Sequence, residues 1–305
     1  MSKNTTKGIQ LSLVTAFISG FSIFINKFAV GSITPPLVFT TVKNLGVGLF
    51  IISFLLLSGR WKLIKKLNKK EILNLLLIGI FGGSVPFYLF FAGLSRIPAI
   101  NAALIHKTLV FWVALLALPT LKEKLTKTQI LAIMLLFSSN LIVGGFKGFE
   151  YSVGELLVLG ATILWALENV LAKKTLKTIH PDIVTAARMG LGSIILLIAS
   201  VILAPEGLTQ AAKLDNSQLF WIVITMISLL GYVASWYRAL KLAPVTTVAT
   251  VLVSSTLVTN ILSAIFITHV FNSTLVIQTA LVTTGIWFFI KTSKEAGPSA
   301  TKALN

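Results

Sequence analysis

Ten long apolar segments follow one another along the chain, separated by short polar stretches that are rich in turn residues. Each segment is close to the roughly 20 apolar residues that a helix needs to cross the hydrocarbon core of a membrane. The apolar residues run continuously and do not alternate as they do in barrel strands, so the pattern predicts helices. The predicted spans are 8–29, 36–58, 72–93, 98–118, 128–146, 154–172, 182–204, 218–240, 244–267 and 274–290.

Composition agrees with this fold class, an all-α integral membrane protein of ten transmembrane helices. Hydrophobic residues make up 55% of the 305 residues, and only 11% are charged, whereas about a quarter are charged in soluble domains. The formal net charge of +17 by itself suggests nucleic acid as a partner. The basic residues fall in short loops between apolar segments, however, so no nucleic-acid partner is expected.

The distribution of Lys and Arg predicts the orientation of the chain. With the N-terminus inside, 19 of the 26 Lys and Arg residues lie on the cytoplasmic side, 3 lie outside and 4 lie within spans. Cytoplasmic loops of membrane proteins carry such an excess, and it attracts anionic lipid headgroups. We therefore expect a multi-pass protein of the cell (inner) membrane, in contact with membrane lipids. Residues 1–7 and 291–305 are its predicted cytoplasmic tails.

The two halves of the sequence are related by a shift of 145–146 residues. FFAGLSRIP at 90–98 aligns with WYRALKLAP at 236–244, and Lys43 aligns with Arg188. Each half holds five predicted spans, and an odd number forces the second copy into the membrane in the opposite orientation. Two inverted repeats, 8–146 and 154–290, are therefore predicted. In secondary transporters built this way, the substrate site lies near mid-membrane between the repeats.

In the order and spacing of these features, the chain resembles the EamA-type drug/metabolite transporter superfamily over about residues 8–290. The resemblance rests on the two aromatic-aromatic-x-small-Leu-x-x-x-Pro elements, at 90–98 and 236–244, and on the Leu-Lys-Glu-Lys-Leu run at 121–125. Where this run has Glu, the second half has His269 in the alignment. The resemblance implies a secondary active transporter of a small metabolite, not an enzyme.

Charged residues inside the predicted spans are the first candidates for the site, because a charge at mid-membrane costs at least about 2.5–3.5 kcal/mol. Lys43 and Lys107 are predicted to bind substrate, although Lys43 lies close enough to the interface for snorkelling to be an alternative. Arg188 and Glu168 lie at similar depths and are predicted to form a structural ion pair. Two cations then remain unpaired. A substrate carboxylate or phosphate would relieve their cost, as would loss of a proton from lysine.

Aromatic and hydroxyl side chains complete the predicted substrate site. Tyr88, Tyr232 and Trp236 have polar atoms that need partners, which favours a pocket; a lipid-facing or interfacial position is the alternative. Ser255 and Thr259 share one face of the ninth span, where they either border the cavity or bond neighbouring helices.

Glycines in the third predicted span indicate a kink there and close packing of that helix. Gly79, Gly82 and Gly83 stand just before Pro86. A break of this kind serves equally well as a hinge or as a close helix contact.

The sequence lacks the residues and motifs that most other classes of protein need. There is no cysteine, and His106, His180 and His269 are far apart, so we expect no metal site, no cofactor and no catalytic residues. No G-x-x-x-x-G-K-[ST] motif occurs. Exchange with a proton or a counter-solute is therefore expected to drive alternating access. A flippase for a lipid or lipid-linked sugar is the alternative, and an intramembrane enzyme a remote one. Both a monomer and a homodimer fit the sequence.

Overall fold

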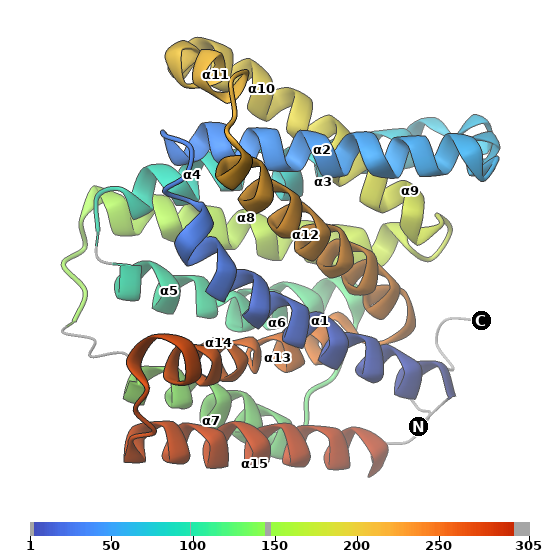
Figure 1. Cartoon of the computed structure of the whole chain (residues 1–305). Coiled ribbons are helices and arrows are strands. Elements are labelled where there is room, and N and C mark those ends of the chain that lie inside the picture. The colour runs from blue at the N-terminus through green and yellow to red at the C-terminus, as the bar shows by residue number, and fades with distance from the viewer. Residues whose placement is uncertain (1–2, 98, 144–147, 296–305) are drawn as a thin grey trace.

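The structure, a computed structural model, describes residues 3–97, 99–143 and 148–295, and its elements within these ranges are all helices (Figure 1). In chain order they are α1 (Lys3–Ala29), α2 (Pro36–Leu57), η1 (Arg60–Lys66), α3 (Lys69–Gly83), α4 (Val85–Leu94), α5 (Ala99–Lys107), α6 (Leu109–Leu121), α7 (Lys127–Val143), α8 (Val153–Thr175), α9 (Pro181–Ala186), η2 (Ala187–Leu191), α10 (Gly192–Leu203), α11 (Pro205–Ala211), α12 (Asn216–Leu242), α13 (Val245–Leu252), α14 (Ser255–Ser263), η3 (Ala264–Thr268) and α15 (Ser273–Glu295).

Within the described ranges, nine segments are long and apolar enough to cross a membrane, where the sequence predicts ten. Several of them join two or three of the helices named above, such as Lys69–Leu94, which contains α3 and α4. The segment that is not among the nine is α7, for which 17 residues are described. The predicted span 128–146 ends at residues outside the described part of the chain, so the tenth span stays a prediction.

Polar residues at the ends of the apolar runs fix where helices begin. Asn68 accepts a hydrogen bond from the backbone N–H of Glu71, whose side chain accepts one from the backbone of Asn68. The same reciprocal capping box joins Ser152 to Glu155 at the start of α8. Each box satisfies backbone donors that the first turn of a helix leaves free. Membrane-length helices therefore start where the hydrophobic pattern starts.

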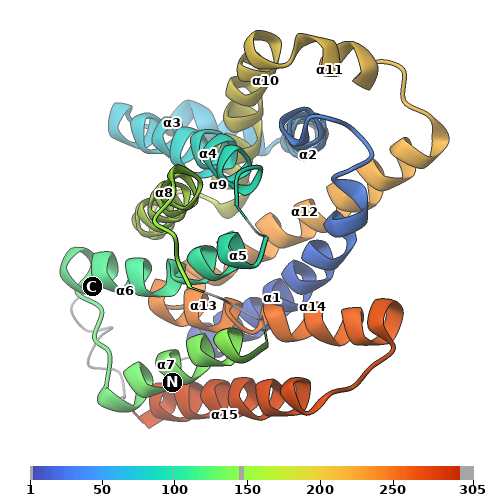
Figure 2. The same cartoon turned by 90° about the vertical axis from the view of Figure 1, so that its left-hand side faces the viewer.

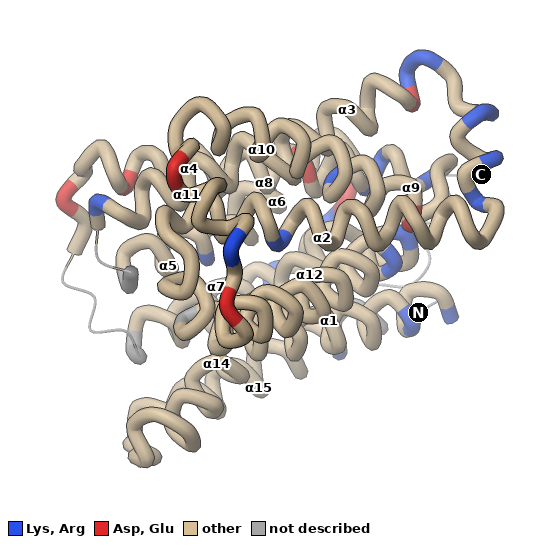
Figure 3. Tube along the Cα trace, turned by 45° about the horizontal axis from the view of Figure 1, so that its top comes forward, with Lys and Arg blue, Asp and Glu red and all other residues tan. Residues whose placement is uncertain are grey.

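The helices form a bundle in which α1 runs beside α12 and also contacts α13 and α14. Figure 2 shows α7 and α15 side by side at one edge, with α3, α4 and α8 in a separate group. In Figure 3, Lys and Arg gather at the end of the molecule where α1 begins, and few lie at the opposite end. This one-sided distribution is what the positive-inside rule describes.

Two spans are broken at corresponding places in the two halves. Thr108 separates α5 from α6 with φ −64° and ψ −10°, and Ser254 precedes α14 with φ −64° and ψ −12°. The two residues stand 146 positions apart, the same offset that relates the halves of the sequence. At each break a backbone N–H bonds the carbonyl three residues back, Thr108 to Ile105 and Ser254 to Val251. The repeat is therefore visible in the backbone conformation.

The predicted kink in the third span is confirmed, and no break matches it within the described part of the second half. The chain breaks at Ser84 (φ −134°, ψ −77°), between α3 and α4. A Cβ on Gly83 would lie 2.1 Å from the backbone oxygen of Arg188, and one on Gly82 would lie 2.6 Å from Cγ of Glu168. These glycines let α3 reach the backbone of η2, a π-helical turn that carries Arg188.

Candidate functional site

Arg188 and Glu168 form a buried group with Tyr237 between α8, η2 and α12. Arg188 Nη1 lies 3.5 Å from Glu168 Oε2, and the Tyr237 hydroxyl donates to Glu168 Oε1 at 2.6 Å. Arg188 Nη1 also donates to the Tyr237 oxygen at 3.4 Å. Arg188 is 6% exposed, and the other two are completely buried. One positive and one negative charge neutralise each other here, so the group fits a structural role.

Lys43 occupies the position in the first half that Arg188 occupies in the second, with different partners. Its ammonium donates to Asn26 Oδ1 at 3.3 Å and lies 5.0 Å from the centre of the Phe39 ring. The residue is 7% exposed, so its side chain lies inside the bundle and does not reach the surface as snorkelling would require. Among the residues that the structure describes, no carboxylate oxygen lies within 4.0 Å of this ammonium. The described neighbours of the Lys43 nitrogen are therefore neutral, an amide oxygen and an aromatic ring.

Lys107 links the two broken spans. It is the last residue of α5, directly before the break at Thr108, and its ammonium donates to the hydroxyl of Ser255 at 3.3 Å. Ser255 is buried and is the first residue of α14, directly after the other break. No carboxylate in the described ranges lies within 4.0 Å of Lys107 either. The structure thus brings a cation, a hydroxyl and two helix breaks to one place.

The remaining residues of the predicted site have separate environments. Trp236 is 1% exposed and donates from Nε1 to Asn169 Oδ1 at 3.2 Å, and its ring stacks on Tyr232 at 5.9 Å. Thr259 donates to the carbonyl of Gly20 at 2.9 Å, so it joins α14 to α1. Tyr88 is 40% exposed. The structure therefore groups Lys107 with Ser255 and gives Thr259 and Trp236 contacts that hold helices together.

An aromatic group surrounds the residue before Lys107. The His106 ring lies 5.0 Å from Trp165 and 5.7 Å from Phe90, both edge-on. Trp112, one turn into α6, donates from Nε1 to the Thr108 hydroxyl at 3.1 Å. His106 and Lys107 thus follow each other in the chain, but their side chains have different neighbours, as adjacent positions on a helix require.

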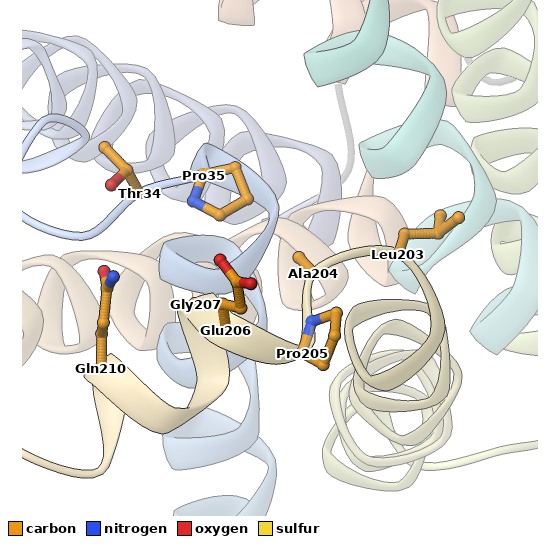
Figure 4. A pocket seen from close by; sticks show the side chains of 8 residues that line it. All are labelled: Thr34, Pro35, Leu203, Ala204, Pro205, Glu206, Gly207 and Gln210. Carbon is orange, nitrogen blue, oxygen red and sulfur yellow. The ribbon is translucent and has the colours of Figure 1, made fainter.

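A surface hollow of about 500 Å³ lies elsewhere, between the α1–α2 loop and the junction of α10 with α11 (Figure 4). None of its lining residues is a predicted site residue. It lies at the ends of helices, whereas the breaks, Lys43 and Lys107 lie within the spans. We therefore place the candidate site at the breaks and not in this hollow. The lining residues are Thr34, Pro35, Leu203, Ala204, Pro205, Glu206, Gly207 and Gln210.

Charged side chains close the end of the bundle where the basic residues gather. Glu123 accepts hydrogen bonds from the backbone N–H groups of Val245 (2.8 Å) and Thr246 (3.1 Å) and from the Thr246 hydroxyl (2.6 Å). Lys173 donates to the carbonyls of Leu240 and Ala243, at 2.6 and 2.7 Å. A carboxylate at the start of α13 and an ammonium at the end of α12 both suit the helix dipoles. Together they fix the corner between these helices.

The backbone conformation shows that the predicted alignment of His269 with Glu123 is wrong. Lys122 directly follows α6 in the left-handed conformation with φ 54°, and His269 directly follows η3 with the same φ of 54°. His269 therefore corresponds to Lys122. The turn that follows is one residue shorter in the second half, where Asn272 caps α15 as Thr126 caps α7. The carboxylate of Glu123 has no counterpart in that turn.

Removing the Glu123 carboxylate is expected to destabilise the protein. In Glu123→Ala the N–H groups of Val245 and Thr246 lose their acceptor, which costs about 1–3 kcal/mol of unfolding free energy. Denaturant unfolding in detergent measures this loss. Lys124→Ala, at the exposed neighbouring position, should stay within about 0.5 kcal/mol of wild type. Equal stability of the two variants would contradict the capping role.

A second ionic group at the same end surrounds Asp182, which is 1% exposed. Arg60, from the α2–α3 connection, and Arg238, from α12, both pair with it, the latter at 2.6 Å. Burial lowers the pKa of the adjacent His180, while Asp182 opposes the shift. Asp182 thus ties the first half of the chain to the second outside the apolar core.

Several residues near the site carry no signal in the sequence. Asn26 is recognised as a partner of Lys43 only in the structure, and the breaks at Thr108 and Ser254 contain neither Gly nor Pro. The offset of 146 residues does relate the two breaks. A search for hydroxyl residues at matching positions of the two halves would therefore have found them.

Broken helices that meet inside an apolar bundle, beside a lysine without a described counter-charge, are typical of membrane transporters built from structural repeats. The chain belongs to the EamA-like transporter family, because the family model matches residues 6–145 and again residues 152–291. It is therefore a multi-pass membrane protein, and its two halves are two copies of the family's unit.

The relatives agree with this membership. The chain is 28% identical over 239 residues to YyaM, an uncharacterized transporter of Bacillus subtilis (strain 168), covering 73% of this chain and 75% of YyaM. It is 25% identical over 210 residues to an uncharacterized transporter of Methanothermobacter thermautotrophicus, covering 63% and 61%. One solved crystal structure superposes with a TM-score of 0.77 over 95% of this chain and 98% of that chain. At 15% identity, that likeness shows the shared fold.

Proposed function

We propose that this protein is a secondary transporter that moves a small metabolite with an anionic group across the cytoplasmic membrane by alternating access. The observation that carries the proposal is the position of Lys107, whose ammonium joins the breaks of two spans from different halves and faces no described carboxylate. Exchange with a proton or a counter-solute would drive transport.

The proposal includes the membrane topology. Residues 8–146 and 154–290 form two five-helix repeats of opposite orientation, with residues 1–7 and 291–305 as cytoplasmic tails. The gathering of Lys and Arg at the end where α1 begins supports this orientation (Figure 3). The paired breaks at Thr108 and Ser254 support a site between the repeats.

The electrostatics of the site favour an anion. Arg188 has Glu168 as its counter-charge, whereas Lys43 and Lys107 have neutral partners, Asn26 and Ser255. An unpaired cation is unfavourable at low dielectric, and a bound carboxylate or phosphate removes this cost. The N-termini of α6 and α14 also lie at the two breaks, and helix N-termini attract negative charge.

The test begins with a thermal-shift screen of organic acids, amino acids and phosphorylated metabolites, followed by uptake of the best anion into proteoliposomes. Lys107→Gln is expected to lower this uptake at least about tenfold, because a charge-assisted hydrogen bond contributes about 1.5–3 kcal/mol. Lys213→Gln, at an exposed position, is the control and should transport normally. Uptake that neither Lys107→Gln nor Lys43→Gln changes would refute the anion site, and uptake of a lipid-linked sugar instead would favour the flippase.

A further inference from the structure

One face of α2 carries two buried polar side chains without a partner. Asn44 is completely buried, and within the described part of the chain neither its Nδ2 nor its Oδ1 has a hydrogen bond. The Thr40 hydroxyl, one turn earlier on the same face, is also fully buried and unpaired. The two side chains therefore contribute three buried polar atoms without a hydrogen bond to the described residues.

Most other buried polar side chains near these two residues have partners. The neighbouring Thr41 donates to the Leu37 carbonyl at 2.9 Å and meets the Ser200 hydroxyl at 2.8 Å. The buried Asn169 accepts from Trp236. Gln278 has one unpaired atom and a bond through another, whereas the unpaired Nδ1 of His106 belongs to a ring that packs against Trp165. Each unsatisfied buried group costs about 1–3 kcal/mol, so such groups in a native protein need an explanation.

The position of the pair connects it with the candidate site. Val47 and Ile51, on the same face of α2, pack against Met189 and Val233 from the second half of the chain. Thr40 and Asn44 therefore lie on the side of α2 that faces the other repeat. Lys43 follows Thr40 by three residues on α2, and its ammonium donates to Asn26. Residues three apart are neighbours on a helix surface, so an anion at Lys43 would lie beside Thr40, with Asn44 one turn further on the Thr40 face.

We propose that Thr40 and Asn44 form a polar subsite that binds a hydroxyl or a primary amide of the transported anion. The chemistry of the side chains selects these groups. An amide with a free N–H₂ and a free oxygen, beside a hydroxyl, complements a group that both donates and accepts hydrogen bonds. Both side chains are neutral, so they add no second charge requirement. This inference rests on the proposed function and adds the substrate class: anions that carry a hydroxyl or an amide.

Stability gives the first arm of the test. Asn44→Leu replaces the unsatisfied amide by an apolar side chain of similar size, so the unliganded protein should unfold at a higher temperature than wild type. The matched control is Asn169→Leu, which leaves the Trp236 N–H unpaired and should unfold at a lower temperature. A fall for Asn44→Leu as large as that for Asn169→Leu would show that Asn44 has a structural partner and would overturn the inference.

Discrimination between matched acids gives the second arm. Wild type in proteoliposomes should take up malate at least about tenfold faster than succinate, or succinamate faster than butyrate, because a site built for a hydroxyl or amide rejects the analogue without it. Asn44→Leu should reduce that ratio to near one and retain uptake of the analogue. A wild-type ratio near one in both pairs, or a ratio that Asn44→Leu leaves unchanged, would overturn the inference alone. Failure of wild type to take up any of the four acids would also overturn the inference. The proposed function is tested separately, by the uptake of the screened anion in Lys107→Gln.

Discussion

Replacing Glu168 by leucine is expected to lower the free energy of unfolding by about 3–5 kcal/mol, the cost of removing one partner of a buried ion pair. Arg188 is 6% exposed, and Glu168 is its only counter-charge within 4.0 Å in the described part of the chain. Without Glu168, its guanidinium stays buried with Tyr237 as a neutral partner. The loss therefore comes from an uncompensated charge and not from the size of the new side chain.

A double variant separates these two causes. Glu168→Leu combined with Arg188→Met removes both charges, and it should recover most of the stability because apolar replacements of buried ion pairs are often neutral. Glu206→Gln, at an exposed position in the first turn of α11, should change stability by less than about 0.5 kcal/mol. Unfolding of the detergent-solubilised protein measures all three. A double variant no more stable than Glu168→Leu would show that the pair is not an isolated structural unit.

Replacing Gly83 by alanine is expected to destabilise the protein by about 1–3 kcal/mol or more, the range for overpacking a close contact. The new Cβ would stand 2.1 Å from the backbone oxygen of Arg188 and 2.9 Å from the Cα of Gly192. Both contacts are with backbone, which cannot turn away as the end of a side chain can. The sign of the stability change separates overpacking from helix propensity, because alanine otherwise stabilises a helix relative to glycine by about 1 kcal/mol.

Gly160→Ala in α8 is the matched control for Gly83→Ala. Its Cβ would have Leu89 Cδ1 at 3.8 Å as its only neighbour within 4 Å among the described residues, an ordinary contact. This variant should therefore keep or gain stability while Gly83→Ala loses it, as measured by the midpoint of denaturant unfolding. If the two substitutions changed stability alike, the close approach of α3 to η2 would be disproved.

The two halves of the chain use the same position for different purposes. Lys43 and Arg188 correspond in the repeat, and both are buried. Arg188 contacts the carboxylate of Glu168 and the hydroxyl of Tyr237, and the glycines of α3 pack against this group. Lys43 has an amide and an aromatic ring, with two unpaired polar groups beside it in the chain. The charge at this position thus has a counter-charge in the second half and neutral neighbours in the first.

Local patterns in the sequence were enough for much of the fold. The length of the apolar runs determined the membrane-spanning helices, because the thickness of the bilayer sets one length for all of them. Gly83 and Pro86 indicated the break in the third span, and the matching depths of Glu168 and Arg188 indicated that they lie near each other. These features depend on periodicity and position within one helix, which the order of residues encodes directly.

Only the tertiary structure decided which side chains share the site. Lys107 meets Ser255 although the two residues are 148 positions apart, because the end of α5 and the start of α14 come together in the folded chain. The lack of hydrogen-bond partners for Asn44 likewise appears only in the folded chain. The backbone also showed that His269 corresponds to Lys122 and not to Glu123. Contacts between repeats depend on helix packing, and a linear pattern of apolar and polar residues does not specify which faces of distant helices meet.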